Sequence, residues 1–68
     1  MIVKVQLDEV TDYRVVLLVH YQAPQMPRYI LRVVVPRDRP NEVEVHAHWM
    51  EPDHVPLAVV ERVREAFA

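Results

Sequence analysis

The chain has 68 residues, of which 51% are hydrophobic and 26% charged, and its formal net charge is −2. This length allows one domain over residues 1–68, and the composition is that of a globular rather than a disordered protein. The longest apolar run, Val15 to Val19, is too short to span a bilayer, and the N-terminal sequence lacks a signal-peptide pattern, which together indicate a cytoplasmic protein.

Several residue types are absent, and their absence limits the chemistry. The chain has no Gly, so a phosphate-binding loop that needs close backbone approach is excluded. It has no Ser and no Cys, which removes the commonest covalent nucleophiles, disulfides and thiolate metal sites. We therefore expect neither an enzyme nor a cofactor. A single Asn and six Pro in loops are typical of a heat-stable protein.

Alternation of apolar and polar residues predicts four strands separated by turn signals. The second segment, Tyr13 to Tyr21, is the most apolar and is expected to be the central strand. The fourth segment places Val43, Val45 and Ala47 on one face and polar residues on the other, which is typical of an edge strand. The expected strands are residues 2–7, 13–21, 28–35 and 42–49.

A C-terminal helix is predicted over residues 54–67. Asp53 is its candidate N-cap, and Pro56 falls in the first turn, where a missing N–H group costs nothing. An apolar stripe at helical spacing follows, made of Val59, Val60, Val63 and Phe67. The predicted fold class is α+β, a four-stranded antiparallel β-meander (ββββα) with the one C-terminal helix packed on one face.

Residues on the same face of neighbouring strands should pair, and this rule predicts the register. On the helix side the expected pairs are Val5–Val15, Leu17–Val33 and Val33–Val45. On the opposite side, called the outer face, they are Val16–Val34, Leu18–Arg32 and Ile30–His48, with Ile2 beside Leu18. The aromatic residues are expected to pack in the core beneath the helix: Tyr13, Tyr21, Tyr29 and Trp49.

The outer face is predicted to carry more aliphatic residues than a monomer needs. Below about 70–80 residues a core seldom supplies more than ~3–5 kcal/mol, and association is a usual remedy. The favoured function is a small non-catalytic protein-interaction module, acting through this face as a homodimer or as a small subunit or inhibitor of a larger protein. The expected interface residues are Ile2, Val16, Leu18, Ile30, Arg32 and Val34.

Nucleic-acid binding is the alternative function. The residues that would contact nucleic acid are the basic ones of the outer face: Lys4, Arg14, Arg32, His46 and His48. The net acidic charge and the lack of an exposed aromatic stripe speak against it. The His46-x-His48 spacing also suits a shared metal ion, but no third ligand can be placed beside the pair. Surface histidines are the favoured interpretation, and no metal is expected.

Overall fold

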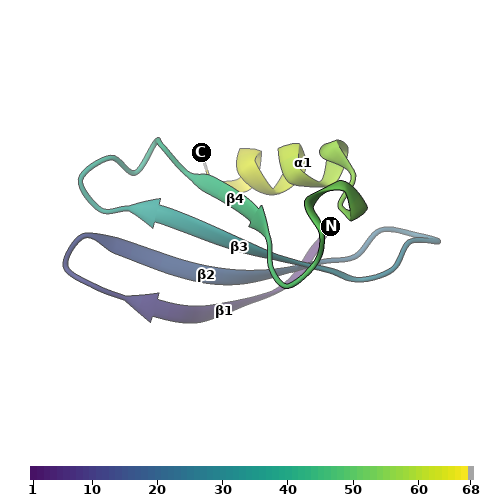
Figure 1. The fold of residues 1–68 in the computed structure, drawn as a ribbon, viewed down its shortest axis with the longest axis horizontal. Coiled ribbons are helices and arrows are strands. Elements are labelled where there is room, and N and C mark those ends of the chain that lie inside the picture. The colour runs from purple at the N-terminus through teal and green to yellow at the C-terminus, as the bar shows by residue number, and fades with distance from the viewer. Residues whose placement is uncertain (68) are drawn as a thin grey trace.

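The computed structural model describes residues 1–67 and contains one antiparallel sheet with strand order β1-β2-β3-β4. Its elements are β1 (Ile2–Val10), β2 (Arg14–Tyr21), β3 (Tyr29–Pro36), β4 (Glu44–Ala47), the 3₁₀ turn η1 (Pro52–His54) and α1 (Leu57–Phe67). The helix lies on one face of the sheet (Figure 1). The predicted α+β meander is therefore confirmed. Within residues 1–67, no helix is long and apolar enough to cross a membrane.

The core lies between α1 and the sheet. Val59 and Val63 of the helical stripe are buried, and they pack against buried residues of the strands and of the loop that leads into α1. Those residues are Val19, Tyr29, Leu31, Val33, Val45 and Val55. All the strand members of this cluster belong to the alternating set that the sequence assigned to the helix side, so the two faces of β2, β3 and β4 are as predicted.

The register of the three later strands is also confirmed. Leu17 lies opposite Val33, which in turn lies opposite Val45. On the outer face Val16 pairs with Val34, and Leu18 pairs with Arg32. The backbone N–H of His48 donates to the carbonyl of Ile30 at 3.1 Å, which extends the β3–β4 pairing beyond Ala47.

The predicted register of β1 is wrong. Val5 pairs with Val19 rather than Val15, and Ile2 lies opposite Tyr21 rather than beside Leu18. The cause is the length of the hairpin, because β1 continues past Leu7 as far as Val10. Thr11 then closes a short turn: its N–H donates to the carbonyl of Arg14 at 2.9 Å, and its Oγ1 accepts from the Arg14 N–H at 3.1 Å. A later turn moves each β1 residue to a partner further along β2.

Two aromatic residues expected in the core are instead on the surface. Trp49 is 69% exposed because β4 ends at Ala47, before the chain reaches it, and Tyr13 lies exposed in the β1–β2 turn. Asp53 is part of η1 and does not cap α1, which begins at Leu57. The carbonyl that accepts the first helical N–H groups belongs to Pro56, at 3.0 Å from Val59 N and 3.3 Å from Val60 N.

Replacing Val33 with Asp should prevent folding. Val33 is fully buried in the centre of the core cluster, and an unpaired buried charge costs several kcal/mol, which is comparable to the whole stability of a small domain. Circular dichroism should show loss of both sheet and helix signals. Val3→Asp, at a half-exposed position of β1, is the control and should stay folded. A cooperative melt of the Val33→Asp protein would contradict the assignment of the core.

Candidate interaction surface

The aliphatic centre of the outer face is covered by the protein's own side chains. Val16 is 0% exposed and Val34 is 6% exposed, although α1 lies on the opposite face of the sheet. Glu9 is the direct neighbour of Val16 on β1, and Arg14 lies two residues before Val16 on β2. Their side chains form an ion pair of 2.8 Å on the face that Val16 occupies, and we infer that the Arg14 stem and the Glu9 carboxylate shield Val16.

The other predicted interface residues fall into two groups. Leu18, Ile30 and Arg32 lie on the outer face as expected and are half-buried. Ile2 lies on the helix side, where it packs against the core cluster, so its assignment to the outer face is wrong. Its placement follows from the changed β1 register. An interface built on the remaining outer-face residues stays a prediction.

The basic residues proposed for nucleic-acid contact are spread over the outer face. Lys4 pairs with His20 at the β1 edge, whereas Arg32 and His46 are cross-strand neighbours on β3 and β4. Arg14 is engaged with Glu9, and His46 Nε2 lies 3.7 Å from a Glu44 carboxylate oxygen. Acidic partners thus offset part of the positive charge. Nucleic-acid binding by this face stays a prediction.

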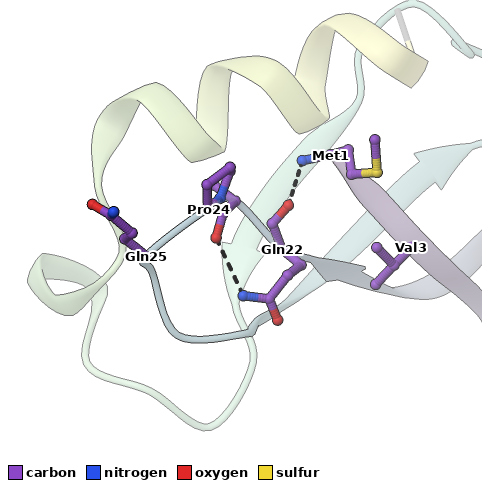
Figure 2. Close-up of a pocket in the computed structure, with 6 residues that line it drawn as sticks. Met1, Val3, Gln22, Pro24 and Gln25 are labelled. Atoms are coloured by element: carbon purple, nitrogen blue, oxygen red, sulfur yellow. Dashed lines mark hydrogen bonds between the residues drawn. The ribbon is translucent and has the colours of Figure 1, made fainter.

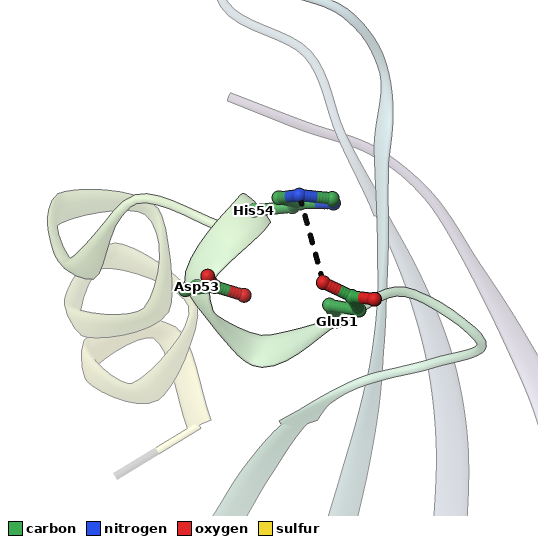
Figure 3. Close-up of side chains that lie close together, drawn as sticks. All are labelled: Glu51, Asp53 and His54. Atoms are coloured by element: carbon green, nitrogen blue, oxygen red, sulfur yellow. Dashed lines mark ion pairs between the residues drawn. The ribbon is translucent and has the colours of Figure 1, made fainter.

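The histidine pair is not where potential metal ligands gather. The His48 ring packs edge-on against Trp49, with centroids 4.3 Å apart and an interplanar angle of 67°. Within residues 1–67, the group whose ligand atoms all lie within 4.8 Å of one another is Glu51, Asp53 and His54 (Figure 3). All three side chains are exposed, and a His54–Glu51 contact of 3.8 Å accounts for their proximity. Sequence spacing did not reveal this group because η1 was not predicted.

A shallow apolar pocket of about 480 Å³ lies where the N-terminus meets the β2–β3 loop. Figure 2 shows Met1, Val3 and Gln22 among the residues that line it. Two of the polar groups beside it are already paired, since the Met1 ammonium donates to the Gln22 carbonyl at 2.6 Å and Gln22 Nε2 donates to the Met26 carbonyl at 2.6 Å. The pocket therefore offers mainly apolar contact, with Gln25 as the further polar residue in its lining.

The accessible apolar surface lies instead on the helix side, along β1. Val5, Leu7 and Val10 are 49%, 66% and 54% exposed. Their partners on β2 show that they share the face of the core, because Val5 pairs with the buried Val19 and Leu7 with Leu17. We call this surface the open strip, which consists of Val5, Leu7 and Val10 with the half-buried Val15 and Leu17 beside them.

The open strip exists because α1 covers only part of the sheet. The helix contacts β4 and β2, and Figure 1 shows it over the β4 side, away from β1. Val5 was predicted to lie on the helix side, and alternation does place it there together with Leu7. The sequence pattern gave no information about how far a helix that begins at Leu57 reaches across the strands.

No family model, curated protein or solved structure matches this chain. The chemistry of its surfaces is consequently the basis on which a function can be inferred.

Removing the side chain that covers Val16 should destabilise the fold moderately. Arg14→Ala is expected to lower the free energy of unfolding by about 1–2 kcal/mol, mainly through lost packing, because a partly exposed ion pair contributes only about 0–1 kcal/mol. Arg14→Met keeps an apolar stem and should lose less than half as much in urea unfolding. Equal losses in the two variants would show that charge, not coverage, is what Arg14 supplies.

Proposed function

We propose that this protein is a small non-catalytic interaction module that binds another polypeptide through the open strip. The observation that supports this is three aliphatic side chains, Val5, Leu7 and Val10, each about half exposed or more on one strand. Soluble proteins usually bury their aliphatic side chains, and a contiguous exposed apolar surface is typical of a site that contacts another protein. The partner is a second copy of the chain, or a larger protein of which this chain is a small subunit or inhibitor.

Energetics support the same proposal. A chain of 68 residues has a small core, and here no disulfide supplements it because the chain has no Cys. Full burial of a Val or Leu side chain is worth about 1.5–3 kcal/mol, so covering even part of the open strip would add appreciably to a marginal stability. Association through this surface would therefore stabilise the fold and the complex together.

The open strip suits this role better than the outer face. The outer-face aliphatics Val16 and Val34 are already buried within one chain, so a partner would gain little apolar area from them. Leu7, by contrast, has two thirds of its surface available to a partner. Our proposal includes a cytoplasmic location and a heat-stable fold, which the absence of Cys and the Pro-rich loops support.

The double substitution Val5→Thr and Leu7→Thr should weaken association at least tenfold. Thr keeps the β propensity of these strand positions but removes aliphatic contact, and a loss of 1.4 kcal/mol corresponds to a factor of ten. Sedimentation velocity should be measured for the purified chain, and for the labelled chain added to an extract of its native host. The variant should sediment as the monomer where the parent sediments as a complex.

Leu57→Thr is the matched control. Leu57 is 72% exposed at the start of α1, outside the open strip, and this variant should sediment like the parent. Circular dichroism should show that all variants remain folded, since Leu7 contributes little to the core. If the double variant and the parent sediment alike in both preparations, the open strip is not an interaction surface.

A further inference from the structure

We infer that the partner at the open strip is a second copy of this chain, joined by antiparallel pairing of the two β1 strands about a twofold axis through Gln6. This inference rests on the proposed function and specifies its partner. The pairing would convert two four-stranded sheets into one continuous eight-stranded sheet.

The first argument concerns the two edges of the sheet. β1 is an edge strand of nine residues, whereas β4, the other edge, has only four. Exposed edges are usually protected by Pro, by bulges or by charged side chains, and the one Lys of β1, Lys4, would meet an acidic residue in the pairing described below. β1 contains no Pro, and its irregularities lie at its ends, between Ile2 and Lys4 and between Leu7 and Glu9. The stretch Lys4–Leu7 between them is regular and free to pair.

The second argument is charge complementarity. With the axis at Gln6, Lys4 of one copy lies opposite Asp8 of the other, and symmetry makes this contact twice. Lys4 pairs with His20 on the outer face. Asp8 is the extra residue at the irregularity between Leu7 and Glu9, and it precedes Glu9, which lies opposite the outer-face Val16, so that Asp8 and Glu9 both oppose Val16 as the two residues of a bulge. On the helix side, Val5 lies opposite Leu7 of the second copy. Opposite charges and aliphatic residues thus meet in one register.

Neighbouring registers lack this match. When two copies of a strand pair antiparallel about a twofold axis, the axis must pass through a residue, which then lies opposite its own copy. Only then do paired residues point to the same face of the sheet. An axis at Val5 sets Ile2, which packs on the helix side, opposite Asp8 of the outer face. An axis at Lys4 sets two ammonium groups side by side, and an axis at Leu7 sets Lys4 opposite the helix-side Val10. Among these, Gln6 is the position that satisfies both faces.

The pairing also accounts for the exposure of the open strip. Because the axis is perpendicular to the sheet, both α1 helices lie on the same side, and the two open strips join between them. Each Leu7 gains an aliphatic neighbour, Val5 of the second copy, in the direction that is solvent in the single chain. The amide of Gln6, already 3.0 Å from His20 Nε2, comes to lie beside its own copy on the outer face.

Charge reversal tests the contact. Lys4→Glu or Asp8→Lys alone should weaken dimerisation about tenfold, because each places like charges opposite one another twice, and the two together should restore it to within about threefold. Sedimentation velocity of the purified proteins measures this. Arg39→Glu and Glu42→Lys change the net charge by the same amounts at the exposed β3–β4 turn and should leave the dimer unchanged.

Disulfide formation tests the register, and the absence of native Cys makes this test clean. Residues opposite each other across an antiparallel pair have Cα atoms roughly 4.5–5.5 Å apart, within disulfide range, so Gln6→Cys should form a covalent dimer on mild oxidation. Lys4→Cys should not, since its two copies would lie about 13 Å apart along the strands.

The outcomes separate this inference from the proposed function. In one outcome the parent is a dimer that Val5→Thr/Leu7→Thr dissociates, but the single charge reversals and the double reversal leave its affinity unchanged. This result would overturn the β1 pairing and keep the open strip as an interaction surface. The same conclusion would follow if the purified protein is a monomer and forms a complex only in host extract, and if Val5→Thr/Leu7→Thr prevents that complex. If the Val5→Thr/Leu7→Thr variant sediments like the parent, both as the purified protein and in host extract, the β1 pairing and the proposed function are both overturned.

Discussion

The size of α1 is the constraint on which the rest of the structure depends. Eleven residues make a helix roughly 16 Å long and about 10 Å across, whereas four strands about 4.8 Å apart form a face roughly 19 Å wide that extends to roughly 30 Å along β1. One such helix cannot cover four strands. It is centred where Val59 and Val63 meet Leu31, Val33 and Val45, so the edge furthest from it, β1, keeps its apolar face in contact with solvent. The open strip is the direct consequence.

Aliphatic residues that α1 does not cover occur on both faces of the sheet, but they are shielded from solvent on one face and exposed on the other. On the outer face the buried Val16 lies beside the ion pair of Arg14 and Glu9, two charged residues that can shield it. On the helix side of β1 the cross-strand neighbours of Val5, Leu7 and Val10 are themselves aliphatic, namely Val19, Leu17 and Val15, and Leu7 stays 66% exposed. Where the chain shields aliphatic residues with its own charged side chains, the surface has little apolar area to bury against a partner. A surface that it cannot cover favours association.

Much of the fold could be predicted from alternation alone, because Val, Leu and Tyr on one face of β2, β3 and β4 leave a single compatible register. The β1 pairing could not, because Asp8 and Glu9 look like turn residues although the ladder runs on to Val10. The solvent exposure of individual side chains was harder to predict than the strand pairing. Alternation tells which face Leu7 or Trp49 occupies, but only the position of α1 and the end of β4 determine whether anything covers them. The diameter of a single helix, about 10 Å, compared with the width of four strands, roughly 19 Å, was the available signal.

Amide hydrogen exchange at several protein concentrations tests the central claim, that β1 is the association edge, most directly. Association of β1 should slow exchange of amides between Lys4 and Asp8 as concentration rises, because amides at a free edge exchange readily until they pair. Amides of β4, the opposite edge, should exchange at the same rate at every concentration. Concentration-dependent protection on the outer face or on β4, with none on β1, would contradict the account.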